Sequence, residues 1–461
     1  MSIKAKLTTF DAAMIVISLI IGIGIFRTPA LVAASAGTPF LFFAAWVLGG
    51  LVSFLGALVF AEIGARFPKP GSYYQVVADN YGSGLAFMLN WANMLIMNGA
   101  GAAAVAIIGA EYLVPVIGVS GLVGRHGIQF TAVCLVATLL FVNYQGIKTG
   151  ARAQNLLSGL KVAMIGVLAA AAFLARRGST APEALSVSRP WPLALGAAVI
   201  SVLYAYGGYQ NIINFGADVR DARRNLPRAV LFGILIVIAC YLAVNAAYFR
   251  ALGIDGVASA ELVAAETART AFGEAGRVVV SLAIFISAMG FLNVTLMQMP
   301  RTYFAMAADR TLPRAFMKVN PKTQTQEFGL LCLGGIILLS IFFLGTFENI
   351  LNYVMFVDPM TLALVASTVF VLRRKAARSG ELFAGYRAPL FPILPIVFIF
   401  FEVMVSANVL INRPREALYG TLLLAAGVPV FLLMRKVNKA PFPDEPGPER
   451  SARGAPSPPE A

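Results

Sequence analysis

The sequence is poor in histidine and cysteine, the residues on which most metal centres and many catalytic sites depend. His126 is the only histidine, so neither a histidine-based metal site nor a His-containing catalytic triad can be built. Cys134, Cys240 and Cys332 lie in three separate apolar stretches without C-x-x-C spacing, which is typical of small buried hydrophobic residues. No nucleophile–base pair stands out either, so we expect no enzyme, no metal and no cofactor.

Charge is also scarce. Charged residues make up 13% of the 461 residues and hydrophobic residues 59%, which leaves too little polar surface for a water-soluble globule. Twelve apolar runs are long enough to cross about 30 Å of hydrocarbon as helices. The sequence therefore predicts an all-α integral membrane protein with twelve transmembrane helices. The runs lie near 12–34, 39–65, 83–117, 127–146, 155–175, 193–216, 229–250, 278–307, 328–346, 349–372, 391–411 and 416–434.

The positive charges are unevenly distributed between the loops. With the N-terminus in the cytoplasm, 24 Lys and Arg residues fall on that side and nine on the other, which obeys the positive-inside rule. We expect a multi-pass protein of the inner or plasma membrane with both termini cytoplasmic. The net charge of +14 needs no nucleic acid, because the basic residues are scattered over short loops. The Pro- and Ser-rich tail, residues 440–461, is expected to be disordered.

The first apolar run could instead be a signal peptide, because Lys4 and Lys6 precede it and a run of small residues ends it. Arg27 and Pro29 interrupt the approach to that supposed cleavage site, and the even number of spans needs this run. A membrane span is the favoured interpretation.

Two apolar runs are interrupted by glycines. Gly22 and Gly24 lie in the first run, and Gly207 and Gly208 in the sixth. Such glycines can simply allow close helix packing. Glycine-interrupted helices in corresponding halves also mark transporter binding sites, where freed N–H groups meet an anion and freed carbonyls meet a cation. This pattern predicts a site for a zwitterion. Its expected substrate-binding residues are Ile21, Gly22, Ile23, Gly24, Ile25, Tyr204, Ala205 and Gly207.

Three charged residues in or at the ends of these runs are candidates for coupling or gating. Lys161 could reach the cytoplasmic surface by snorkelling, or it could be held by carbonyls of the first run. Glu62, near Arg66 and Lys69 in the sequence, is expected at an inner gate, or else is simply satisfied by neighbouring basic side chains or loop N–H groups. Arg301 is expected to act in a gate, at a kink or in a helix–helix contact. The charged stretch at 218–228 is as consistent with a solvated, self-paired cytoplasmic loop as with a functional role.

Several motifs in order along the chain carry a family resemblance. They are Gly22-Ile23-Gly24-Ile25-Phe26, Ala61-Glu62-Ile63-Gly64, Pro68-Lys69-Pro70-Gly71, Lys161, Tyr204-Ala205-Tyr206-Gly207-Gly208-Tyr209, Arg224-Asn225-Leu226-Pro227-Arg228, Leu312-Pro313, Tyr353-Val354-Met355-Phe356-Val357-Asp358 and Tyr386-Arg387-Ala388-Pro389. From about residue 8 to 435 the chain resembles the amino acid-polyamine-organocation superfamily. It is most similar to the L-type amino-acid transporter branch and its bacterial relatives.

The resemblance implies a division of the chain into two inverted five-helix repeats, 11–176 and 190–375. Two peripheral helices at 388–435 follow, with cytoplasmic ends at 1–10 and 440–461. It also implies sodium-independent transport, with Lys161 in the place of a sodium ion and Tyr241 acting near that lysine. Nothing in the sequence resembles an accessory subunit. The implied partners are an L-amino acid and the lipid bilayer.

The resemblance implies that Tyr204 acts in gating as an aromatic lid, at a position where Phe is often found. The chain also departs from the family pattern at Ile23, where serine is usual, at Tyr209, where Trp is common, and at Pro300. No carboxylate is expected beside either break, and Ile, Ala and Tyr would form the wall. We therefore expect an exchanger or facilitator for small or medium neutral L-amino acids. The alternatives are a proton-coupled symporter and a non-transporting sensor on the same fold.

Overall fold

The computed structural model describes residues 5–118, 120–174, 190–260, 262–273, 275–343, 347–380, 383–412 and 414–438. The described chain is helical throughout, apart from two isolated β-bridges. The disorder expected for the tail lies outside these residues. The helices are α1 (Thr9–Ile20), α2 (Gly24–Ala36), α3 (Pro39–Arg66), α4 (Ser72–Tyr81), α5 (Ser83–Ala92), η1 (Asn93–Ala100), α6 (Gly101–Val116), α7 (Ser120–Tyr144), α8 (Ile147–Leu174), α9 (Trp191–Tyr206), η2 (Tyr209–Asn214), α10 (Ala222–Ser259), α11 (Val263–Phe272), α12 (Ala275–Ala308), η3 (Arg314–Met317), α13 (Glu327–Phe343), α14 (Phe347–Ser379), α15 (Ile393–Asn412) and α16 (Pro414–Val437).

Local signals explain where several helices begin. Thr8 and Asp11 form a capping box at the start of α1, which satisfies two N–H groups that the first turn leaves free. Thr38 caps α3, and Pro39 occupies the first position, where its missing N–H costs nothing. The stretch at 93–100 is a π-helix, a widened turn that the run of small residues around it did not predict.

Ten of the twelve expected spans meet the length and hydropathy required to cross a membrane, judged on the described residues alone. Nine are helical stretches, of which 83–116 and 191–214 combine more than one element, and the tenth is the pair α1 and α2, which bends by 46° at its break. The ninth expected run forms a shorter apolar helix, Glu327–Phe342. The run at 349–372 lies within α14 but is not among the spans. The structure therefore supports a multi-pass helical membrane protein.

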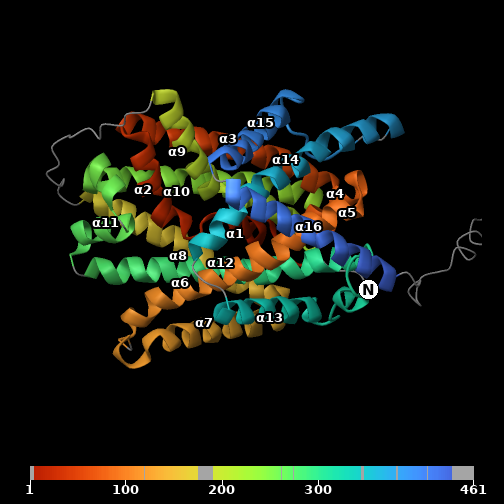
Figure 1. Ribbon diagram of the computed structural model, residues 1–461, viewed down its shortest axis with the longest axis horizontal. Coiled ribbons are helices and arrows are strands. Elements are labelled where there is room, and N and C mark those ends of the chain that lie inside the picture. Colours follow the sequence, from red (N-terminus) through yellow and green to blue (C-terminus); the bar gives the residue numbers. More distant parts are fainter. Residues whose placement is uncertain are drawn as a thin grey trace, which may run out of the picture.

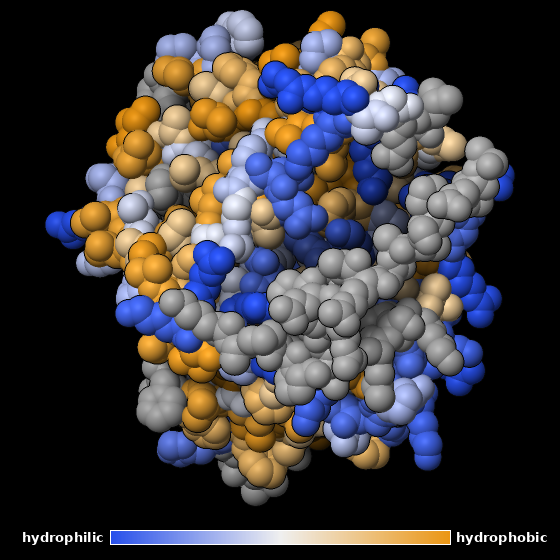
Figure 2. Space-filling view, turned by 90° about the vertical axis from the view of Figure 1, so that its right-hand side faces the viewer, coloured by the Kyte–Doolittle hydropathy of each residue, from blue (hydrophilic) through white to orange (hydrophobic). Residues whose placement is uncertain are grey.

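The helices lie roughly along one direction, with α1 in the middle and with α7 and α13 along one side (Figure 1). Helix α1 packs against α8, α10 and α12, while α2 packs against α9 and α10. Viewed along the bundle, hydrophilic side chains gather on the end face and hydrophobic ones cover its flanks (Figure 2). This is the surface expected of a protein whose flanks face lipid.

An aromatic cluster packs where α3, α9 and α10 meet. The Trp46 ring lies 5.8 Å from that of Tyr241 and 5.9 Å from that of Tyr206, and the two tyrosine rings are 4.9 Å apart. All three side chains are fully buried. This cluster holds α10 against α3 and α9.

Candidate functional site

The break between α1 and α2 leaves backbone donors free on one side. Ile21 is extended, and Gly22 donates back to Ile20 over 2.8 Å. The N–H groups of Ile23, Gly24 and Ile25 have no hydrogen-bond acceptor among the described residues. They form the first turn of α2, where a helix leaves N–H groups unbonded and carries partial positive charge. This end of the break can receive an anion.

The carbonyls on the other side of the break are occupied by Lys161 of α8. Its Nζ donates to Ile21 O at 2.7 Å and to Ser18 Oγ at 2.8 Å, and lies 3.4 Å from Ser18 O. Only 2% of Lys161 is exposed, so the side chain does not reach a membrane surface in this structure. The contact with carbonyls of the first run is the one expected from the sequence. An ammonium is thereby built into the break.

Helix α12 closes this arrangement through two small residues that the sequence did not single out. Ser287 Oγ lies 3.1 Å from Gly22 O and 3.3 Å from Ile21 O. A Cβ added at Gly290 would lie 2.6 Å from Lys161 Cε and 2.8 Å from Ser18 Oγ. Gly290 therefore leaves the space that the ammonium occupies. Neither residue has a motif around it that could have marked its role.

The second break, between α9 and η2, lies directly against the first. Gly208 has a φ of 116°, and a Cβ there would lie 2.2 Å from Leu19 O, so only glycine fits. The Tyr241 hydroxyl lies 3.1 Å from both Ile20 O and Ala205 O. One buried hydroxyl thus bridges the ends of α1 and α9, and the contact supports the expected association of Tyr241 with the break.

Open space adjoins the free donors. A Cβ added at Gly22 would meet no atom within 4 Å, and one at Gly24 would meet Ala205 Cα at an ordinary 3.8 Å. Tyr204, near the end of α9, is 37% exposed, whereas Ala205 and Tyr206 are buried. Close packing therefore does not explain Gly22. Of the expected substrate-binding residues, Gly24 lies against Ala205 across the two breaks, and Gly22 adjoins the open space.

Glu62 lies at the end of α3 in a dense polar network. Its carboxylate accepts from Arg66 Nε at 2.7 Å, from Arg373 Nη2 at 2.6 Å and from Ala388 N at 2.8 Å. Lys69, the other cation near Glu62 in the sequence, lies 3.5 Å from Asp79 instead. The carboxylate is thus neutralised by neighbouring groups, as the structural alternative proposed, and it ties α3 to α14 and to the 383–390 segment.

A tyrosine outside the spans adjoins this network. Burial raises the pKa of the Tyr386 phenol to about 12, and the charge of Glu62 adds to the increase. Tyr386 therefore stays neutral beside the carboxylate at physiological pH.

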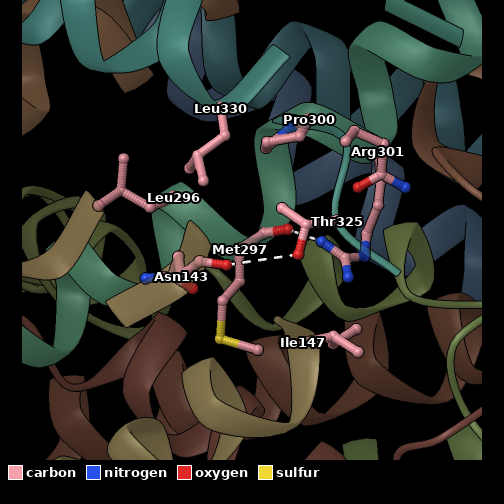
Figure 3. A pocket seen from close by; sticks show the side chains of 9 residues that line it. Asn143, Ile147, Leu296, Met297, Pro300, Arg301, Thr325 and Leu330 are labelled. Carbon is pink, nitrogen blue, oxygen red and sulfur yellow. Dashed lines mark hydrogen bonds between the residues drawn. The ribbon is translucent and has the colours of Figure 1, made fainter. Parts of the chain in front are cut away.

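Arg301 of α12 forms a buried ion pair with Asp218. Its Nε lies 2.5 Å from Asp218 Oδ2, and the guanidinium stacks on the Phe215 ring at 4.8 Å. Figure 3 shows the Arg301 side chain reaching the Met297 carbonyl, to which it donates, beside Thr325 and Asn143. Asp218 is fully buried, so the interpretation of its stretch as a solvated loop is wrong at this residue.

The same segment holds the N-terminus. Lys6 N and Leu7 N both donate to Asp218 O at 2.8 Å, and Arg220 N donates to Leu7 O at 3.0 Å. Asp218 therefore joins the chain before α1, the segment after η2 and α12. We call this set the latch: Leu7, Asp218, Arg220 and Arg301.

A bundle of apolar helices with two adjoining breaks, donors on one side and a built-in ammonium on the other, defines a membrane carrier for small zwitterions. The family follows from comparison: a family model described as amino acid permease matches residues 7–432. The chain belongs to the amino acid permease family.

Relatives match almost the full length. The chain is 29% identical over 447 residues to the serine/threonine exchanger SteT of Bacillus subtilis (strain 168), covering 94% of this chain and 98% of that protein. It is 26% identical to the human Asc-type amino acid transporter 1, and the match covers 94% of this chain and 82% of that protein. It is 25% identical to the mouse large neutral amino acids transporter small subunit 2, and the match covers 94% of this chain and 81% of that protein. These homologues are transporters, not enzymes, and the chain is accordingly an amino acid transporter of a membrane.

Proposed function

We propose that this permease is a sodium-independent exchanger or facilitator for small or medium neutral L-amino acids. The observation that carries the proposal is the occupied break. The Lys161 ammonium lies 2.7 Å from Ile21 O, on the side of the break where a coupled metal cation would bind. A fixed cation there makes an added sodium ion unnecessary.

The substrate carboxylate binds at the start of α2, where the N–H groups of Ile23, Gly24 and Ile25 lack acceptors among the described residues. The substrate ammonium faces the last carbonyls of α9, which a helix end leaves short of donors. The side chain then lies toward Tyr204 and the open space at Gly22. Serine, threonine and large neutral amino acids in the names of the relatives support a neutral substrate.

In this proposal the chain forms two inverted repeats, 11–176 and 190–375, followed by two peripheral helices within 388–435. The first and sixth expected spans are the interrupted ones, which is the relation that inverted repeats produce. We place 1–10 and 440–461 in the cytoplasm. Transport alternates access around the breaks, with Tyr204 as the lid on one side and the Glu62 network and Arg301 as gates on the other.

Counterflow in proteoliposomes tests this function. The purified chain alone, without any accessory subunit, is reconstituted with unlabelled amino acid inside and traces of labelled amino acid outside. A prior thermal-shift screen of the twenty amino acids selects the substrates, because a ligand that binds the folded state raises its apparent stability. We expect counterflow of small or medium neutral L-amino acids, equally in sodium and in choline. No counterflow for any ligand of the screen, or counterflow that needs sodium, would contradict the proposal.

A further inference from the structure

Helix α8 contacts α1 through two polar side chains besides Lys161. Asn155 Nδ2 donates to Asp11 Oδ1 at 2.6 Å, and Ser158 Oγ donates to Met14 O at 2.8 Å. Both acceptors belong to α1, the helix that ends in the first break. Together with the contacts of Lys161 described above, these bonds join the two helices at three successive points.

The spacing of the three contacts is regular. Their donors on α8 are three residues apart, and the side chains or carbonyls that accept on α1 are three and four residues apart, so each set lies on one face of its helix. Sliding α1 by a single residue, about 1.5 Å, would stretch all three contacts at once. We call this set the α1–α8 seam: Asn155, Ser158 and Lys161 with their partners Asp11, Met14 and Ser18.

Ser158 is also the end of a buried chain of amides. Its hydroxyl accepts from Gln154 Nε2 at 3.0 Å. Gln154 Oε1 accepts from Asn293 Nδ2 at 2.8 Å, and Asn293 Oδ1 accepts from Asn143 Nδ2 at 2.8 Å. Each of these four residues is at most 5% exposed. The chain therefore runs from α7 through α12 and α8 to Met14 O of α1, and it anchors the middle of the seam to the rest of the bundle.

The Lys161 ammonium cannot follow α1 if that helix shifts. The space around it is limited, because a Cβ at Gly290 would lie 2.6 Å from Lys161 Cε and 2.8 Å from Lys161 Nζ. A hydrogen bond weakens steeply when its geometry changes, so Ile21 O meets the ammonium only while α1 keeps its register on α8. Apolar packing alone would bury the two helices without fixing this register, whereas polar bonds at defined positions do fix it.

We propose that Asn155 and Ser158 are positioning residues for transport, which hold α1 in the register where its carbonyls bind the Lys161 ammonium. The proposal rests on the proposed function, because it takes Lys161 as the built-in cation. Asn155 and Ser158 act through α1: their partners, Asp11 and Met14, lie before the break in the chain.

The test compares Ser158→Ala in the wild type and in Lys161→Met. Counterflow in proteoliposomes is measured per amount of folded protein, together with the melting temperature. In the wild type we expect the rate to fall about fivefold, the effect of losing a typical hydrogen bond. In Lys161→Met we expect no further fall, because no ammonium is left to position. A merely structural role would lower the rate by the same factor in both backgrounds.

Two more variants complete the experiment. Asn155→Ala removes another contact of the seam at a half-buried position, so it decides the question by the same comparison even if Ser158→Ala does not fold. Ser406→Ala is the matched control. Ser406 is a buried serine of α15 whose hydroxyl donates to Glu402 O of its own helix at 3.2 Å, and its replacement should leave counterflow unchanged.

The outcomes separate this inference from the proposed function. Wild-type rates in both Ser158→Ala and Asn155→Ala would overturn the positioning role, and so would equal losses with and without Lys161. Either result, with sodium-independent counterflow in the wild type, would leave the proposed function intact. Absence of counterflow in the wild type, or a need for sodium, would refute the proposed function itself.

Discussion

At the scale of single residues, the ammonium of Lys161 decides the character of the site. It is a compact charge that donates to Ile21 O and Ser18 Oγ. Lys161→Met keeps most of the bulk and removes both charged hydrogen bonds, each worth roughly 1.5–3 kcal/mol. We expect a folded protein whose counterflow falls at least about tenfold, which corresponds to about 1.4 kcal/mol. Lys161→Arg should recover only part, because a planar fork does not fit a point charge. A fully active methionine variant would contradict the role of the charge.

Gly290 tests the same position without touching the charge. Alanine there would put its Cβ 2.6 Å from Lys161 Cε, so the ammonium must leave its carbonyls. We expect Gly290→Ala to lower counterflow about as much as Lys161→Met. Gly166→Ala is the matched control, because Gly166 lies on α8 like Lys161 and a Cβ there meets no atom within 4 Å. Equal activity of both alanine variants would mean that the ammonium is not position-sensitive.

Gly22 tests where the substrate lies. A side chain at this position meets no atom within 4 Å and requires no left-handed backbone, so Gly22→Leu should fold. It fills the space beside the free N–H groups, and we expect both the substrate-induced thermal shift and counterflow to disappear. Gly196→Leu in α9 also enters open space and should leave both intact. A normal thermal shift in Gly22→Leu would place the substrate elsewhere.

At the scale of helices, the sequence predicted the elements better than their contacts. Both glycine breaks and the long apolar helices follow from local composition, because backbone freedom and hydropathy are local properties. The partners of the charges do not: Glu62 and Arg373 are 311 positions apart, and Ser287 meets Gly22 across 265. Lys69 is nearer to Glu62 in the sequence than Arg373 is, yet it pairs with Asp79. Gly290 has no side chain, so the sequence alone did not show that it leaves space for the Lys161 ammonium.

The latch joins three elements through one buried ion pair. Removing one member of such a pair leaves an uncompensated buried charge, at a cost of about 3–5 kcal/mol. Arg301→Met and Asp218→Asn should therefore each lower the thermal stability, and the double variant should regain part of it. If the latch gates transport, the double variant should bind substrate normally in the thermal-shift assay and still transport slowly. Normal counterflow in the double variant would make the pair structural only.

At the scale of the whole molecule, the polar networks gather near one end of the bundle. The N-terminal segment, the Glu62 network and the latch all lie at chain positions that the charge distribution assigns to the cytoplasm. Hydrophilic side chains cover the end face in Figure 2. The partly exposed Tyr204 lies instead at the break after α9 and belongs to none of these networks.

The proposed independence of sodium depends both on single residues and on how the broken helices pack. Here Lys161, Tyr241 and Ser287 already contact the carbonyls of Ser18, Ile20, Ile21 and Gly22, which are the groups that a metal cation at the break would need. We therefore expect the same counterflow rate when choline replaces sodium on both sides, and the same thermal shift. In Lys161→Met the carbonyls lose their donor, so that variant is the informative comparison. Sodium-stimulated counterflow in the wild type would refute the built-in cation. Stimulation confined to Lys161→Met would support it most directly, because the metal would then be replacing the ammonium.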